Sequence, residues 1–258
     1  MKTYELAEGI MYGPVRSRRM GLSLGVNLLP GGFKLCSFNC PYCQCGWSTR
    51  KVDSPALASF RFPSAAEVAA AVGERLRELR GSGNGIDSLT FSGNGEPTLH
   101  PDFPDVVRAV LEVRDREMPE VRVDILTNGA HLSRSGVVGG LNLLDERYVK
   151  LDAGDGAKLR EMNRPLVPLE LEDLVRGTGL LRDFIAQAMF TSGSCDNTDR
   201  ASLECWIALV GRLRPKAVHL YSLDRRPADP GVRAVDRGRL EEIAREVQVR
   251  AGVAARVF

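Results

Sequence analysis

The chain has 258 residues and a formal net charge of +2, with 43% hydrophobic and 26% charged residues. This balance fits a globular α/β protein and neither demands nor excludes nucleic-acid binding, because a local basic patch can lie within a near-neutral total. No run approaches the roughly 20 apolar residues of a membrane span, and the first residues lack the apolar core of a signal peptide. We therefore expect a cytoplasmic protein with no membrane association.

Short runs rich in β-branched residues alternate along the chain with segments of helical periodicity. This alternation is typical of successive βα units around a parallel sheet, either barrel-like or open. Strands are expected at residues 23–29, 86–92, 121–127, 147–152, 183–190 and 216–223, with a possible short last strand at 253–258.

The helix between the first two strands carries the clearest signals. Ser64 and Glu67 form a capping box, and an apolar stripe runs from Val68 to Leu79 before Gly81 ends the helix. Further helices are expected at residues 102–116, 169–180, 198–213 and 237–250. No composition break separates the units, so we expect one domain over residues 1–258, with an N-terminal arm at 1–20. In such folds the functional residues follow the strands, in the βα loops.

Four of the six cysteines lie within ten residues, after the first predicted strand. On the loop at 33–46, Cys36, Cys40 and Cys43 have spacings that suit three of the four irons of a cubane cluster and leave the fourth iron open. A zinc site would close with a fourth ligand, either Cys45 or a histidine, and the three histidines stand apart in the sequence.

The spacing Cys-x3-Cys-x2-Cys, with the aromatic Tyr42 before the last cysteine, resembles the signature of the radical S-adenosylmethionine (SAM) superfamily. The resemblance implies a [4Fe–4S] cluster held by Cys36, Cys40 and Cys43, with SAM bound to the open iron through its amine and carboxylate. One electron would cleave SAM into methionine and a 5′-deoxyadenosyl radical, which abstracts a hydrogen atom from the substrate. Tyr42 would pack near the adenine. Together with the βα pattern, this favours a partial (βα)6 TIM-like barrel with a parallel sheet.

Residues 91–99 read Phe-Ser-Gly-Asn-Gly-Glu-Pro-Thr-Leu and follow the second strand. They resemble the superfamily's Gly-Gly-Glu motif, which implies that Gly93, Asn94, Gly95 and Glu96 bind the amino group of SAM. Glycines let the main chain approach a ligand closely, and a glutamate accepts hydrogen bonds from an ammonium. The alternative is an ordinary strand-to-helix turn.

Two polar residues end the next strands. Asn128 lies in a Thr-Asn-Gly sequence that resembles the superfamily's motif at that place, although Asn-Gly turns are common. Asp152 ends the fourth strand, where it is expected either to meet the SAM ribose or amine or to cap a helix.

A closer resemblance covers nearly the whole chain and rests on motifs at residues 12–19, 23–25, 93–97, 151–154, 163–165, 187–190 and 226–227. They resemble the Fe–S oxidoreductases related to the wyosine-base-forming tRNA enzymes. Those enzymes carry upstream cysteines for a second cluster, and no cysteine precedes Cys36, which argues against a pyruvate-splitting tRNA reaction. Five arginines in or beside these motifs either lie on the surface or grip the SAM carboxylate or an anionic substrate: Arg16, Arg18, Arg19, Arg164 and Arg226.

The remaining cysteines give weak candidates for catalysis. Cys45 and Cys195 are candidates for hydrogen donors or thiyl radicals, because both are expected near the active face. Cys205 falls in the helix at 198–213 and is expected to be a small buried or half-buried residue.

We therefore expect a radical SAM enzyme that acts on a small molecule or an RNA base and takes its electron from an external flavodoxin- or ferredoxin-type donor. Two alternatives remain: a protein- or peptide-modifying activase, and an iron–sulfur or zinc protein without SAM chemistry.

Overall fold

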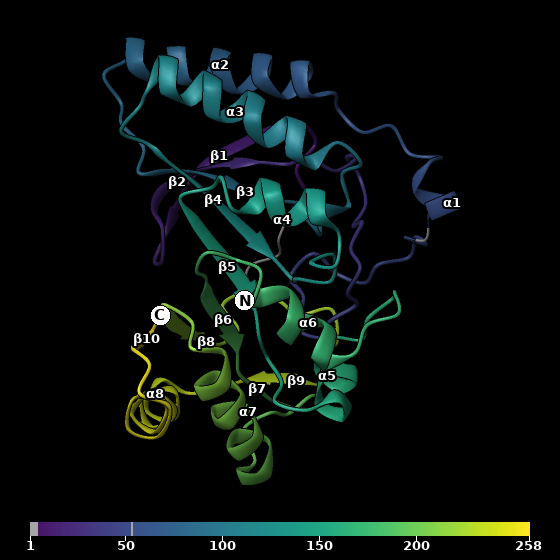
Figure 1. Ribbon diagram of the computed structural model, residues 1–258, viewed down its shortest axis with the longest axis vertical. Coiled ribbons are helices and arrows are strands. Elements are labelled where there is room, and N and C mark those ends of the chain that lie inside the picture. The colour runs from purple at the N-terminus through teal and green to yellow at the C-terminus, as the bar shows by residue number, and fades with distance from the viewer. Residues whose placement is uncertain (1–4, 53) are drawn as a thin grey trace.

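The computed structural model describes residues 5–52 and 54–258, and it contains one curled eight-stranded sheet (Figure 1). The strand order is β1-β2-β3-β4-β5-β6-β8-β10; β1 pairs antiparallel with β2 and every later pair is parallel. The predicted partial barrel is confirmed. The strands are β1 (Met11–Ser17), β2 (Gly21–Val26), β3 (Ser88–Phe91), β4 (Arg122–Thr127), β5 (Glu146–Lys150), β6 (Ile185–Met189), β8 (Ala217–Tyr221) and β10 (Ala255–Val257).

Every predicted helix is present, with its bounds shifted by a few residues at most. The helices are α1 (Ser54–Leu57), α2 (Ala65–Gly81), α3 (Phe103–Glu117), α4 (Ser135–Leu141), α5 (Gly156–Met162), α6 (Leu171–Thr178), α7 (Arg200–Leu213) and α8 (Arg237–Ala251). The capping box of Ser64 and Glu67 is formed. In Figure 1, α2 and α3 lie side by side at one end of the molecule, and α7 and α8 pack together at the other.

Three parts of the fold differ from the sequence prediction. The expected N-terminal arm contains a strand, because β1 adds an antiparallel edge to the sheet. The helices α1, α4 and α5 were not predicted, since none has more than seven residues, too few to show a helical period. The short strands β7 (Thr191–Gly193) and β9 (Val232–Ala234) form a separate antiparallel pair beyond the carboxyl end of the sheet.

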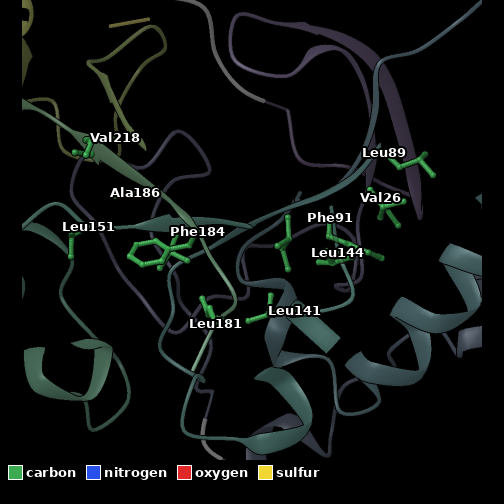
Figure 2. Close-up of a cluster of buried hydrophobic side chains, with 14 of the residues drawn as sticks. Val26, Leu89, Phe91, Leu141, Leu144, Leu151, Leu181, Phe184, Ala186 and Val218 are labelled. Carbon is green, nitrogen blue, oxygen red and sulfur yellow. The ribbon is translucent and has the colours of Figure 1, made fainter. Parts of the chain in front are cut away.

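The strands alternate between apolar residues toward the helices and polar residues on the concave inner face. Leu24 and Val26 of β2, Leu89 and Phe91 of β3, and their counterparts on later strands pack against α2, α3, α7 and α8 in the main core (Figure 2). The intervening residues include Ser23, Thr90, Asp124, Gln187 and His219, all buried. Because side chains alternate faces along a strand, this period of two makes the inside of the barrel polar.

The β1–β2 turn covers the inner face at the amino ends of the strands. Met20 is buried against Tyr148 and Ile185. Its carbonyl accepts hydrogen bonds from Arg122 Nη2 at 3.3 Å and from Ser88 Oγ at 3.5 Å. This turn therefore closes one end of the barrel beneath the inward-facing residues.

Asp124 lies on this inner face, fully buried, and neither carboxyl oxygen has a hydrogen-bond partner among the described residues. Burial raises its pKa to about 7; the Arg122 guanidinium, 3.7 Å away, opposes the rise, and the nearby Glu146 and Asp145 reinforce it. In the folded protein the neutral acid therefore predominates below about pH 7.

We predict that Asp124→Asn removes a pH-dependent loss of stability. The pKa of Asp124 in the folded protein lies above the unfolded value of 3.8. Its contribution to the free energy of unfolding is therefore fully present below about pH 4 and is lost as pH rises through 7. Between pH 4 and pH 8 the free energy of unfolding of the variant should rise by up to about 4 kcal/mol relative to that of the wild type, since one pKa unit is worth about 1.4 kcal/mol. Denaturant unfolding across this range measures it, with the exposed Glu112→Gln as control. Parallel pH profiles for the wild type and Asp124→Asn would contradict the prediction.

Candidate functional site

A cavity of about 240 Å³ opens at the carboxyl ends of the parallel strands. The loop after β2 forms one wall with Cys36, Cys40 and Cys43, and the ends of β4, β5, β6 and β8 form the other. Most of the candidate residues that the sequence places just after the strands line this one cavity.

The cysteine loop is fixed to the turn after β3. Leu35 N donates to the Asn94 carbonyl at 2.8 Å, and Glu96 N donates to the Leu35 carbonyl at 3.1 Å, which forms a parallel β-bridge between Leu35 and Gly95. Gly95 has φ +149°, and a Cβ there would lie 1.8 Å from the Leu35 carbonyl oxygen. Only glycine allows this approach, so the turn and the loop are docked as one unit.

Hydrogen-bond donors lie beside the sulfurs of Cys36 and Cys40. Cys36 Sγ accepts from Phe38 N at 3.4 Å and from Asn128 Nδ2 at 3.6 Å, and Asn163 Nδ2 lies 3.6 Å from Cys40 Sγ. Such donors stabilise thiolate ligands and tune the potential of an iron–sulfur cluster.

Lys34 and Cys45 favour a thiolate at Cys43. A hydrogen bond from Cys45 and the charge of Lys34 lower the pKa of Cys43 to about 5, against the opposing effect of burial. Burial raises the pKa of Cys36 to about 12, against the opposing charge of Lys34. Among the residues that the structure describes, no three His, Cys, Asp or Glu side chains converge tightly enough to hold a single metal ion. A cubane needs no such convergence, because each thiolate binds its own iron.

Glu96 is buried at the cavity wall and is held by four donors. Its Oε1 accepts from Thr98 Oγ1 at 2.6 Å, Thr98 N at 3.2 Å and Thr127 Oγ1 at 2.7 Å, while Oε2 accepts from Asn128 N at 2.7 Å. Burial raises the pKa of Glu96, and these hydrogen bonds oppose the rise. The carboxylate is thus fixed in orientation while Oε2 keeps room for one more donor.

Asn94 faces away from the cavity. Its side chain exchanges two 2.8 Å hydrogen bonds with the backbone of Ala7 and also donates to the Pro30 carbonyl at 3.2 Å. Its flanking residues Gly93 and Gly95 line the cavity instead. The Asn128 side chain does reach the cysteine loop, with Nδ2 3.0 Å from Ser37 Oγ.

Tyr42 and Asp152 belong to one buried network. The Tyr42 hydroxyl donates to Asp152 Oδ2, and Asn163 Nδ2 lies 2.7 Å from both oxygens. Lys150 Nζ lies 3.6 Å from Asp152 Oδ2 and 5.1 Å from the centre of the Tyr42 ring. Although burial opposes it, Asp152 and Tyr221 raise the pKa of Lys150, so the lysine is charged. Tyr42 and Lys150 line the cavity, whereas Asp152 lies behind them.

The other three cysteines lie in very different surroundings. Cys45 lines the cavity beside Cys43. Cys195 is fully buried, 3.1 Å from the Met162 sulfur and outside the cavity lining, which leaves it no access to a bound ligand. The expectation for Cys205 was wrong: it is exposed, because the apolar stripe of α7 that contains Leu203, Trp206 and Ile207 faces the core and leaves position 205 outside.

Of the five singled-out arginines, only Arg19 lines the cavity. The others are exposed on the surface: Arg16, Arg18, Arg164 and Arg226. The sequence analysis missed further cavity residues, namely Lys34, Lys150, Gln187, Tyr221 and Arg225. The signal was available for three of them. Lys150 and Gln187 are register partners and Tyr221 follows two residues after His219, so all three fall on the inward-facing set of their strands.

The family model of the Radical SAM superfamily matches residues 33–165, just over half of the chain. The chain belongs to the radical SAM superfamily. Its members use a [4Fe–4S] cluster and SAM, so the alternative of a protein without SAM chemistry is wrong.

A UPF0026 protein of Methanocaldococcus jannaschii is 31% identical over 85% of this chain and 65% of its own length. The chain spans less than two thirds of the length of the first curated relatives that it matches. Among solved structures, a radical SAM methyltransferase from Sphaerobacter thermophilus superposes with a TM-score of 0.64 at 18% identity, over 92% of this chain and 65% of that one. A structure of TYW1 with a lysine–pyruvate adduct bound superposes with a TM-score of 0.59 at 13% identity, over 88% of this chain and 73% of that one. The resemblance to wyosine-forming enzymes is confirmed at the level of the fold.

We predict that Gly95→Ala separates the cysteine loop from the turn after β3. The added methyl group meets the Leu35 carbonyl, so stability should fall by about 2 kcal/mol or more, and the iron bound after anaerobic reconstitution should fall by at least about half. Gly139→Ala on α4 is the control, since its methyl group meets nothing within 4 Å. Unchanged iron content in Gly95→Ala would show that the close contact does not position the loop.

We also predict a large difference in reactivity between Cys195 and Cys205, the two cysteines that lie outside the cysteine loop. In native protein at pH 8, Cys205 should be alkylated by iodoacetamide at least about 100 times faster than Cys195, whose pKa burial raises to about 12. Peptide mass spectrometry measures both rates, and Cys205→Ser should abolish the fast label. Fast labelling of Cys195 in the folded protein would contradict its burial.

Proposed function

We propose that Cys36, Cys40 and Cys43 hold the [4Fe–4S] cluster of a radical SAM enzyme and that the adjoining cavity binds SAM. The observation that carries this proposal is that the three thiols share one cavity wall with Glu96 and Tyr42. When bound and reduced by one electron, the cluster supplies reductive cleavage of SAM to methionine and a 5′-deoxyadenosyl radical, which takes a hydrogen atom from the substrate. The protein supplies the orientation of both reactants.

Glu96 is proposed to bind the ammonium group of SAM. Four side-chain and backbone donors already fix its carboxylate, so it does not need to reorganise when the ligand arrives. An ammonium also provides the positive partner that a buried carboxylate otherwise lacks. Gly93 and Gly95 flank it with bare main chain at the cavity. Asn128 is proposed to support this position from the other side, because its backbone N donates to Glu96.

Tyr42 is proposed to present its ring to the adenosine of SAM, with Asp152 as a positioning residue. Asp152 lies behind the cavity wall, so it acts through the groups it orients: the Tyr42 hydroxyl, Asn163 and the Lys150 ammonium. This role replaces direct contact with the ribose as our interpretation of Asp152. Cys45 lines the same cavity and remains the better of the two cysteine candidates for a hydrogen donor.

The electron is proposed to come from an acidic external donor of the flavodoxin or ferredoxin type, since radical SAM enzymes generally need such a partner. Three exposed cations flank the cysteine loop: Arg50, Lys51 and Arg164. Arg164 stacks on the exposed Trp47 at 5.3 Å. A basic surface of this kind accelerates the approach of an acidic protein.

The substrate is proposed to be a small molecule or an RNA base. An RNA partner should show binding that weakens steeply with salt, because phosphate contacts release counterions. A protein or peptide substrate is the alternative. No described helix is long and apolar enough to cross a membrane.

We predict that anaerobically reconstituted protein converts SAM to 5′-deoxyadenosine in the presence of dithionite and that Cys40→Ala lowers this rate at least about 100-fold, since a missing thiolate disrupts the cluster. Liquid chromatography of 5′-deoxyadenosine and the iron content of each protein are the measurements. The matched control is Cys205→Ala, which removes an exposed thiol on α7. Intact SAM in the wild type with a full complement of iron, or equal rates in Cys40→Ala, would refute the proposal.

A further inference from the structure

The inner face of the barrel carries a second set of polar groups, on the side of the cavity away from the Gly93–Glu96 turn. Lys150 of β5 and Gln187 of β6 are register partners, and Gln187 is the partner of His219 on β8. Arg19 reaches the same cavity from the β1–β2 turn that closes the other end of the barrel.

Arg19 is held against an aromatic wall without an acidic partner. Its guanidinium carbon lies 4.4 Å from the centre of the Tyr221 ring. Its Nη1 is buried and has no hydrogen-bond acceptor, and Arg19 forms no ion pair with any residue that the structure describes. A guanidinium nitrogen that is desolvated without an acceptor is destabilising, and charged groups cost more than neutral ones.

Gln187 presents a second unsatisfied donor to the same cavity. Its side chain is 5% exposed, and its Nε2 has no acceptor within the described parts of the chain. Both orphan donors line one cavity, in which they await an acceptor that the protein itself does not provide.

The electrostatics of this region favour a negative ligand. The charge of Lys150 is balanced by Asp152 at 3.6 Å. His219 is neutral at physiological pH, because burial, with the charges of Arg19 and Arg256, lowers its pKa to about 4. Arg19 thus keeps its charge without an ion-pair partner among the described residues, and an oxyanion placed between Arg19 and Gln187 would satisfy both donors at once.

We propose that Arg19 and Gln187 form a subsite for the carboxylate or phosphate oxyanion of a small-molecule substrate. This inference rests on the proposed function, because it places the substrate in the cavity that also receives SAM. It narrows the substrate class to small anions, and it gives the β1–β2 turn a direct part in recognition. The oxyanion would be anchored deep in the barrel, with the reacting end of the substrate directed toward the cysteine wall.

A carboxylate is present in SAM as well, so the two sources must be separated. If Arg19 held the carboxylate of SAM, its substitution would weaken the binding of SAM. If Arg19 holds the substrate, its substitution weakens the binding of other anions to protein that already contains SAM.

The test uses anaerobically reconstituted protein saturated with SAM, titrated calorimetrically with inorganic phosphate and, separately, with acetate at constant ionic strength. We expect at least one of these anions to bind the wild type. Arg19→Gln should weaken it about tenfold or more, because a charge-assisted hydrogen bond is lost, and Gln187→Leu should weaken it several-fold. Arg18→Gln is the matched control on the same turn, since Arg18 is exposed, and it should bind as the wild type does. Arg19→Lys, which keeps the charge, should give intermediate binding.

Three results would overturn the inference: no binding of either anion to the wild type, equal binding by wild type and both Arg19 variants, or a tenfold loss of SAM affinity in Arg19→Gln without added anion. Melting temperatures of all variants identify any that do not fold, and Gln187→Leu provides a second route to the same answer. A wild type that binds phosphate or acetate but fails to cleave SAM would refute the proposed function alone.

Discussion

The structure depends on the period of two along its parallel strands. Each strand places one set of side chains against the helices and the other set inside the barrel, and in this chain the two sets differ sharply in polarity. The outward set supplies the core that holds the sheet together. The inward set also contains apolar side chains, Tyr148 and Ile185 among them, but its buried polar groups need partners in the protein or in a ligand.

The inner face divides according to how that requirement is met. Ser23 and Thr90 bond to one another through their hydroxyls at 2.6 Å. Glu96 is satisfied by donors from its own turn and from the end of β4. Lys150 is matched by Asp152. The donors of Arg19 and Gln187 remain unmatched and line the cavity, while the Asp124 carboxyl is unmatched outside the cavity lining.

Much of this arrangement could be read from the sequence, and the failures have physical reasons. The parallel strands were predictable because β-branched runs mark them. The cysteine loop at one wall of the cavity was predictable because the spacing of Cys36, Cys40 and Cys43 is specific. Asn94 shows the limit: a Gly-Asn-Gly turn indicates close backbone contact, but it does not indicate to which side the asparagine points. In the structure it points to the segment before β1, a partner 87 residues away. Long-range contacts of this kind leave no local pattern.

Other failures came from reading each element separately. The stripe formed by Leu203, Trp206 and Ile207 already excluded Cys205 from the core. On a helix with 3.6 residues per turn, position 205 lies on the face opposite to this stripe. In the same way, Asp152 marked the inward set of β5, and counting back two residues leads to Lys150.

The contacts of Asn94 have a practical consequence for handling the protein. One residue joins three separate segments: its side chain binds Ala7 and Pro30, and its carbonyl receives Leu35. The stretch around Ala7 is therefore mechanically linked, through a single asparagine, to the loop that carries Cys36. Tags, cleavage sites or truncations introduced near Ala7 would act on the cysteine loop even though they lie far from it in the sequence, and engineering there should leave that short stretch intact.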